Sequence, residues 1–312
     1  MAELNIADSV LNPQLTKFAI KYTVPGLEPV LPRLQLKAGA HVVKVPSYGT
    51  DWLGLSGVHK RELGAKYEAE LGREAPSLTE VVLERWSASE IVDLDDPTLI
   101  GASVGAYAET LQDKVAILKE KLLRKQAVLE AQAITTTSNY TTTTTPGTKW
   151  DNNGNFIDDI LTAIETINDA VGVAPDTLVI PRRVVYALTQ NTYWVDRVKY
   201  TQTAFSQEGV INALKALFGF QRVVIPPFVT YRAEDGTLTD VYSDNVAVLY
   251  LGQGLNLKNQ AAPVWGVVFE EAGFPRIRTA KIAEGTQILA DHWFKLKVFV
   301  KSAGYLITDV LT

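Results

Sequence analysis

The chain has 312 residues, of which 46% are apolar and 21% charged, and this composition indicates a folded globular protein and excludes wholesale disorder. Its formal net charge of −5 excludes a general attraction to nucleic acid or anionic membranes, which would require clustered Lys and Arg. The absence of cysteine excludes disulfides, thiolate zinc sites and cysteine nucleophiles. No run of eighteen apolar residues predicts a membrane span, so we expect a cytoplasmic protein.

The first third of the chain contains one irregular segment and two extended ones. Residues 1–32 combine scattered apolar residues with several prolines. This pattern is too irregular for a long helix and too apolar for a free tail, so we expect an arm that lies along another surface. Alternating and β-branched residues predict long strands over 34–48 and 76–94. Between them, residues 49–74 are rich in glycine and charge, and a loop of that length is expected to be functional.

The clearest periodic signal lies at residues 99–134, where apolar residues recur mostly every three or four positions and predict one face of a long helix. That face comprises Ile100, Val104, Tyr107, Leu111, Val115, Leu118, Leu122 and Leu129. At the helical rise per residue, the segment is roughly 54 Å long. We interpret the charged face as exposed to solvent, with a weak polyanion contact as the alternative. It carries Asp113, Lys114, Lys119, Glu120, Lys121, Arg124 and Lys125.

The second half of the chain alternates between helices and strands. Threonine favours extended structure through its branched Cβ, so the threonine-rich segment 135–149 predicts a strand interrupted at Ser138 and Asn139, with a flexible linker as the alternative. Beyond it, periodicity and turn residues predict a series of short elements. These are helices over 157–171, 181–191 and 206–219, strands over 177–180, 222–231 and 241–251, a hairpin turn at 234–236, and mostly strands from 263 onward.

One stretch of this half resembles a calcium loop, because oxygen ligands alternate at Asp151, Asn153, Asn155 and Asp159. A helix-loop-helix calcium site also requires Gly at its sixth position and Glu at its twelfth, which here hold Phe156 and Thr162. We therefore predict a helix start near Phe156. Either Asn153 or Asn155 is its N-cap, and Asp158 and Asp159 occupy its first turn, where the helix dipole favours negative charge.

Chemistry-bearing motifs are otherwise missing from the sequence. His41, His59 and His292 lie on separate predicted elements without the spacing of a metal site, and no phosphate-binding or nucleophile motif occurs. The carboxylates that precede Pro97 are interpreted as caps of the long helix rather than as an acid/base pair; they are Asp93, Asp95 and Asp96. The sequence predicts no catalytic, cofactor or metal site and no enzyme, with a catalytic pair drawn from distant positions as the alternative that stays open.

The order of these elements resembles the major capsid proteins of tailed bacteriophages, which share the Hong Kong 97 fold. The most specific likeness is KWDNNGNFIDDILTAIETINDAVGVAPDTLVIPRRVVYALTQN at 149–191. Further segments continue it in order, at 41–52, 60–68, 83–97, 194–201 and 213–226. The resemblance implies an α+β fold with five parts: an N-terminal arm (1–32), an extended β-hairpin loop (33–97), a peripheral domain with the spine helix and a following strand (98–150), an axial α/β domain (151–262), and returning strands of both domains (263–312).

The resemblance also implies a function in assembly. Copies of the chain would form pentamers and hexamers that close into an icosahedral virion shell around double-stranded DNA, contacted without sequence specificity, and assembled in the host cytoplasm without a membrane. Further partners would be a portal protein, with separate scaffolding and decoration proteins possible. The alternatives are an encapsulin-like nanocompartment shell, an α/β enzyme that binds a small ligand, and a tail or neck component.

Two sets of residues receive roles from the resemblance. The loop would lie across the next subunit, and aromatic and apolar anchors suit the core of such an interface; these are Tyr48, Trp52, Leu53, Leu55 and Tyr67. The second set would form a structural junction between the peripheral and axial domains, and comprises Trp150, Asn153, Asn155, Asp158 and Asp159.

Some members of this family crosslink neighbouring subunits through a Lys and an Asn. Lys44, Lys60 and Lys66 lie in or near the loop, but nothing in the sequence distinguishes a reactive lysine from a solvated one, so no crosslink is predicted. Boiling a mature particle in detergent should then release a single band near 34.2 kDa on a denaturing gel. A ladder of linked species would contradict this prediction.

Overall fold

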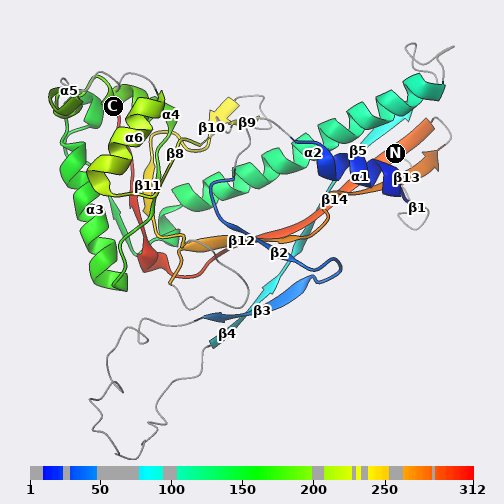
Figure 1. Ribbon diagram of the computed structural model, residues 1–312, viewed down its shortest axis with the longest axis horizontal. Helices are drawn as coiled ribbons and strands as arrows, with labels where there is room; N and C mark the ends of the chain where they lie inside the picture. The colour runs from blue at the N-terminus through cyan, green and yellow to red at the C-terminus, as the bar shows by residue number, and fades with distance from the viewer. Residues whose placement is uncertain are drawn as a thin grey trace, which may run out of the picture.

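The computed structural model of the chain describes residues 10–23, 29–47, 77–93, 104–198, 207–226, 230–232, 238–252, 263–282 and 285–312. Figure 1 shows an elongated molecule with a helix-covered sheet at one end, a long helix lying over a second sheet, and a two-stranded ribbon that projects from the body. None of the described helices combines the length and the apolar composition that a membrane span requires.

A six-stranded sheet forms the elongated part of the molecule. Its strands are β1 (Val10–Leu11), β2 (Arg33–Leu36), β5 (Glu84–Asp93), β12 (Gly266–Glu271), β13 (Arg276–Ile282) and β14 (Gly285–Val298). Strand β14 pairs antiparallel with β13 and then β12 along one edge, and with β5 along the other. The long strand β14 therefore holds this sheet together, as the predicted run of C-terminal strands requires.

Helix α2 (Val104–Thr135) lies along this sheet and, at 32 residues, is about 48 Å long. The predicted apolar face is confirmed where it meets the sheet, because Val115, Leu118 and Leu122 are buried there. The interpretation of the charged face is wrong at Lys119, which is only 8% exposed. Its ammonium group donates hydrogen bonds to carbonyl oxygens at the end of a neighbouring helix, α1 (Pro13–Lys21). The acceptors are the oxygens of Ala19 and of the C-cap residue Tyr22.

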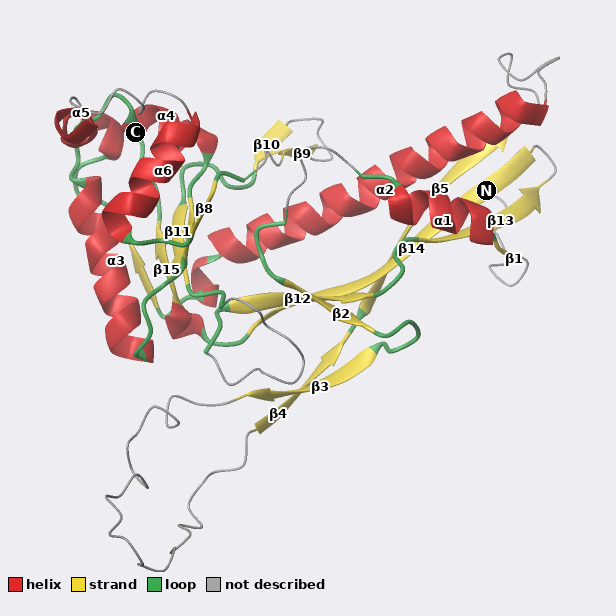
Figure 2. Cartoon of the chain, viewed as in Figure 1, coloured by secondary structure: helices red, strands yellow, loops and turns green. Residues whose placement is uncertain are grey.

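A five-stranded sheet forms the other end of the molecule. It has the order β6 (Thr142–Thr144), β15 (Gly304–Ile307), β11 (Val246–Leu249), β7 (Thr177–Val179) and β8 (Arg222–Val224). Figure 2 shows helices gathered on one side of it. They are α3 (Phe156–Val171), α4 (Arg182–Leu188), α5 (Thr192–Val198) and α6 (Gln207–Phe218). Alternate strand residues face opposite sides, so that Leu178 packs with these helices while Val179 packs in the core that contains the C-terminal half of α2.

Several predicted elements of this end are confirmed within a residue or two. Helix α3 begins at Phe156, β7 lies within 177–180, and α6 ends before Gly219, whose backbone is left-handed (φ 75°) as a C-terminal glycine requires. Strands β9 (Thr230–Arg232) and β10 (Leu238–Asp240) pair antiparallel on either side of the predicted turn at 234–236, which lies outside the described residues.

The two long strands predicted near the start are each divided. The first becomes β2 and β3 (Val42–Ser47), because Gly39 adopts a left-handed backbone (φ 86°) in a turn that sends the chain into another sheet. The second becomes β4 (Ser77–Val82) and β5, separated at Leu83. Among the described strands, β3 and β4 pair only with each other and form the ribbon of Figure 1. The alternation of apolar and polar residues is the same in the strands of both sheets. The sequence pattern therefore could not show that each predicted strand is divided between two sheets.

The strand predicted over 135–149 is reduced to β6, three residues that pair in parallel with β15. The preceding residues instead end α2. The Thr135 and Thr136 hydroxyls donate to carbonyls of the last turn, and the Asn139 amide donates to the Ala133 oxygen. A short 3-10 turn (Thr137–Asn139) follows, and two others span Trp150–Asn152 and Lys301–Ala303. Side-chain bonds to the helix end thus outcompete the extended preference of threonine.

Candidate functional site

The described residues contain no group of three or more His, Asp or Glu side chains placed to hold a metal ion. His41 stacks on Trp293 with ring centroids 3.9 Å apart, whereas His292 is buried against Phe274 and Phe294. The described structure instead brings together segments from distant parts of the chain at three places. These are a junction at residues 149–159, the base of the ribbon, and the length of helix α2. These contacts form the candidate site.

Trp150 is the centre of the junction at residues 149–159. Its side chain is fully buried, and its indole N–H donates to Asp159 Oδ2 at 2.8 Å while its backbone N–H donates to the Val310 oxygen at 2.8 Å. Burial raises the pKa of Asp159, and the indole hydrogen bond opposes that rise. Asp158 and Asp159 lie in the first turn of α3, as predicted, so the tryptophan is fixed on the start of this helix.

The predicted capping of α3 is wrong in its contacts. Asn155 occupies the N-cap position but makes no capping bond, and its amide donates to Asp158 instead. Asn153 has a left-handed backbone (φ 58°), and its Oδ1 accepts from Thr192 N at 3.0 Å, which caps α5 rather than α3. The cause is the tight turn at Gly154, where an added Cβ would lie 2.1 Å from the Thr148 carbonyl oxygen.

Asn191 holds the junction together and was missed by the sequence prediction. It is 1% exposed, and its amide donates to the carbonyl oxygens of Trp150 at 2.7 Å and Gly154 at 3.0 Å. Its own oxygen accepts from Tyr193 N at 2.9 Å, which caps α5. An Asn before Thr192 is a recognisable N-cap signal, but the contacts with residues 41 and 37 positions earlier leave no local pattern.

The base of the ribbon is held by Glu271 at the end of β12. This carboxylate is 4% exposed and accepts hydrogen bonds from the Gly39 N–H and the Arg276 guanidinium. His41 Nε2 lies 3.7 Å from it. On the ribbon itself, Val42 and Val82 are paired across the strands and both are 53% exposed. The predicted interface residues are outside the described part of the chain; these are Tyr48, Trp52, Leu53, Leu55 and Tyr67.

The described residues 10–23 and 29–33 are called the N-terminal segment. Helix α2 holds this segment at two points, through hydrogen bonds to its main chain. The first is Lys119, whose Nζ donates to the carbonyl oxygens of Ala19 at 2.6 Å and of Tyr22. These groups lie at the C-terminal end of α1, where backbone carbonyls lack helical partners and a cation is favourable. Burial lowers the pKa of Lys119. The lysine therefore acts as a C-terminal cap supplied by another helix.

The second point is the crossing segment, defined as residues 29–33, which passes between α2 and β8. Val30 and Leu31 are 2% and 1% exposed, and the Val30 N–H donates to Glu130 Oε2 at 3.3 Å. From the other side, the Arg222 guanidinium donates to the carbonyl oxygens of Pro29 at 2.7 Å and Val30 at 2.9 Å. The crossing segment thus links the long helix to the five-stranded sheet.

Solved structures with phage-related names share this fold. A phage-related protein from Bordetella bronchiseptica RB50 aligns over 97% of this chain and 98% of its own, with 20% identity and a TM-score of 0.66. The putative capsid protein of an E. coli CFT073 prophage aligns over 96% and 99%, with 11% identity and a TM-score of 0.55. A virus-like particle from Pyrococcus furiosus aligns over 94% and 95%, with 11% identity and a TM-score of 0.53.

No family model and no curated protein matches the chain. The structural likeness nevertheless covers nearly the full length of both compared chains. One of the similar structures is a putative capsid protein, which agrees with the fold that the sequence resemblance implies. At these identities the likeness establishes the fold.

Replacing Asn191 with Ala should lower the free energy of unfolding by about 2–4 kcal/mol, because two buried carbonyls and one N–H lose their partners. Denaturant unfolding of the full chain measures this. Asn152→Ala is the matched control, since Asn152 is exposed and makes one side-chain bond to Thr312; its effect should stay within about 0.5 kcal/mol. Equal effects of the two variants would refute the role of Asn191.

Replacing Lys119 with Met should loosen α1, because the side chain keeps its length but leaves buried carbonyls without a donor, at a cost of about 1–3 kcal/mol. Limited proteolysis should then cut within residues 13–23 sooner than in the wild type. Lys121→Met, on the exposed side of the same helix, should leave the rate unchanged. Resistance of the Lys119→Met chain equal to that of the wild type would count against the cap.

Proposed function

We propose that the chain is the major capsid protein of a tailed bacteriophage, which assembles as pentamers and hexamers into an icosahedral shell around double-stranded DNA. The observation that carries this proposal is the structural likeness to a phage-related protein and to the putative capsid protein of a prophage, over 97% and 96% of this chain. The order of elements predicted from the sequence supports it independently.

The shape of the subunit also supports assembly. The ribbon and the N-terminal segment lie at the outside of the molecule and carry apolar side chains that the described part of the chain leaves uncovered (Figure 1). Val10 and Leu11 of β1 are 70% and 50% exposed at a sheet edge, and the Val42–Val82 pair stands on the ribbon. Such residues gain favourable burial when a neighbouring copy covers them.

The division of the chain follows from this proposal. Residues 1–32 are the arm, 33–97 the extended loop, and 98–150 the peripheral domain with its spine helix. Residues 151–262 are the axial domain, and 263–312 return to both domains. Trp150, with Asn153, Asn155, Asp158 and Asp159, then marks the junction between peripheral and axial domains. The proposal gives this junction a structural role and no chemical one.

The partners follow from the same proposal. The chain binds itself, a portal protein, and where present separate scaffolding and decoration proteins, in a virion assembled in the host cytoplasm. The formal charge of −5 supports loose, non-specific contact with packaged DNA, because a shell that held DNA tightly would hinder packaging and release. No enzymatic role is proposed.

A shell that encloses proteins instead of a genome is the second candidate. The likeness to the Pyrococcus furiosus virus-like particle supports a shell of either kind, because that name does not state what the particle contains. The contents of purified particles distinguish the two candidates. Nuclease-resistant double-stranded DNA inside the particle supports the phage capsid, whereas an enzyme cargo supports an encapsulin-like shell.

The proposed loop contacts are tested by replacing Trp52 and Tyr67 together with Ala. Aromatic anchors at interface centres contribute about 2 kcal/mol or more each, so assembly should shift to small species in sedimentation velocity while thermal unfolding of the subunit is unchanged. Lys60→Ala in the same loop is the control and should assemble like the wild type. Normal assembly of the double variant would remove these residues from the interface.

A further inference from the structure

A buried charge imbalance lies where the crossing segment meets α2 and the six-stranded sheet. Arg33 stands between two carboxylates, with NH2 3.9 Å from Glu130 Oε1 and NH1 3.7 Å from Glu270 Oε2. The two carboxylate side chains are only 4% and 7% exposed. Both distances are longer than a hydrogen bond. One guanidinium therefore faces two buried negative charges, which leaves one of them uncompensated.

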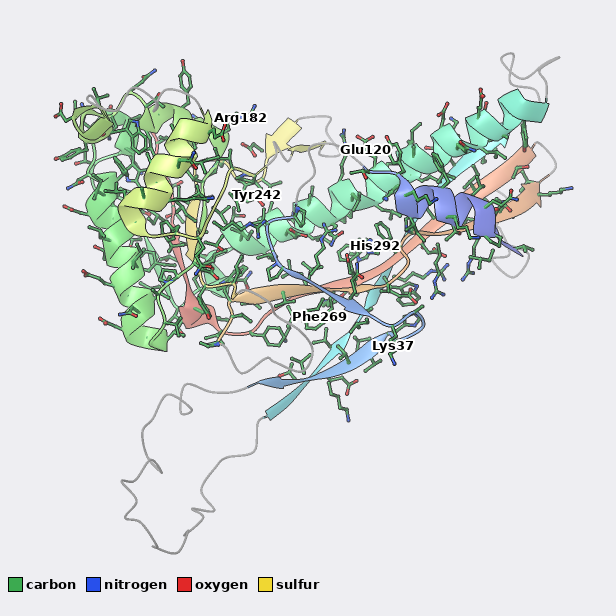
Figure 3. All side chains as sticks on the ribbon, in the orientation of Figure 1. Lys37, Glu120, Arg182, Tyr242, Phe269 and His292 are labelled. Atoms are coloured by element: carbon green, nitrogen blue, oxygen red, sulfur yellow. The ribbon has the colours of Figure 1, made fainter. Side chains whose placement is uncertain are left out.

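The other groups that face Glu130 do not supply a second positive charge. His292 Nε2, on β14, lies 4.0 Å from Glu270, but burial, together with Arg33 and Lys119, lowers the pKa of His292 to about 2, so its ring is neutral. Tyr242 lies beside the C-terminal half of α2, and burial together with Glu130 and Asp240 raises its pKa, so it stays a phenol. Figure 3 shows His292 beneath the middle of α2 and Tyr242 near its C-terminal half.

Charged groups elsewhere around the crossing segment already have partners. Arg222, on β8, is turned to the carbonyl oxygens of Pro29 and Val30, and Lys119 to the end of α1. Within the described residues, by contrast, Glu130 Oε1, Glu270 Oε2 and Arg33 Nε have no hydrogen-bond partner. Both side-chain amide atoms of Gln126, one turn before Glu130, are in the same situation. The cluster thus has spare acceptors and too much negative charge.

A single proton on Glu130 removes this excess. It cancels the second negative charge and leaves the other carboxylate oxygen to accept from the crossing segment. Burial raises the pKa of Glu130 to about 7, and the nearby Glu270 contributes in the same direction. Arg33 and the backbone N–H groups of Leu31 and Val30 oppose the rise but do not outweigh burial.

We propose that Glu130 is a proton-operated latch: protonated, it holds the crossing segment closed against α2, and when it loses its proton the segment opens more readily. The inference concerns the single subunit, so it stands or falls independently of shell assembly. Opening would loosen the N-terminal segment from both the long helix and the five-stranded sheet, since the crossing segment contacts both.

The sign of the pH dependence follows from the two states. In the open state Glu130 is in water with its ordinary pKa of 4.5, whereas in the closed state the value is about 7. The closed state therefore holds a proton that the open state releases between these values. The opening constant rises as pH increases from 4.5 to 7 and levels off above 7. The difference of 7 − 4.5 = 2.5 corresponds to at most about 300-fold.

Hydrogen exchange of the full chain at pH 5 and pH 8 tests the latch. Exchange is measured on a peptide that contains the Val30 and Leu31 amides. The rates are converted to protection factors, because the intrinsic exchange rate itself changes with pH. Protection in the wild type should fall by up to about 70-fold between pH 5 and pH 8, because Glu130 in the open state has already lost part of its protons at pH 5. Glu130→Gln keeps an acceptor and cannot titrate, so its protection should be nearly constant. Glu120→Gln, on the exposed side of the same helix (Figure 3), should behave like the wild type.

Two results would overturn the proposal. One is wild-type protection that does not change between the two pH values. The other concerns Glu130→Gln, which imitates the neutral form. At pH 8 the crossing-segment amides of this variant must be at least as well protected as those of the wild type. Lower protection at pH 8, or a loss of protection with pH as large as in the wild type, excludes the latch. Neither readout depends on whether particles form, so failure of the latch and failure of the capsid proposal remain distinguishable.

Discussion

The whole arrangement depends on helix α2, a single 32-residue rod that packs against both large sheets and holds the N-terminal segment. Its first half buries Val115, Leu118 and Leu122 against the six-stranded sheet, and its last turns bury Val128, Ala131 and Ile134 in the core behind the five-stranded sheet. Burying one such large aliphatic side chain contributes about 1.5–3 kcal/mol. Because both cores share one rigid element, the two sheets are held at a fixed separation, which is the property a subunit of a regular shell requires.

The same helix holds the N-terminal segment through two buried ionisable side chains, in addition to apolar packing around Leu15, Ala19, Val30 and Leu31. Lys119 donates to backbone carbonyl oxygens, and Glu130 accepts from the Val30 N–H, so each makes its hydrogen bonds with the backbone of the segment; Glu130 also faces the Arg33 guanidinium. Burying a charge is costly unless hydrogen bonds compensate it, and such a contact weakens sharply when one partner changes its protonation or position. A segment held in this way can be fixed in one state of the subunit and released in another. This property suits the proposed role in assembly, in which neighbouring copies join the subunit one after another.

Sequence reasoning predicted the parts of the fold that have a local cause. The periodicity of α2, the start of α3 at Phe156 and the end of α6 at Gly219 all leave a pattern within a few residues. The failures have partners far away in the chain. Lys119 contacts carbonyls about 100 positions earlier, Asn191 contacts Trp150 41 positions earlier, and the division between β2 and β3 depends on which sheet accepts each strand. Of the candidate site, the first-turn position of Asp158 and Asp159 was predicted, but Asn191 and the actual hydrogen bonds of Asn153 and Asn155 were not, and the five loop anchors stay a prediction.

Electron cryo-microscopy of the particles formed by the full chain, expressed with and without its genomic neighbours, is the decisive measurement. We expect closed icosahedral shells with pentamers and hexamers, in which residues 49–74 of each copy lie across the adjacent copy and the ribbon of β3 and β4 leads into that contact. A chain that stays a monomer or dimer under all these conditions, or a shell in which residues 49–74 contact only their own subunit, would contradict the assembly proposed for this fold.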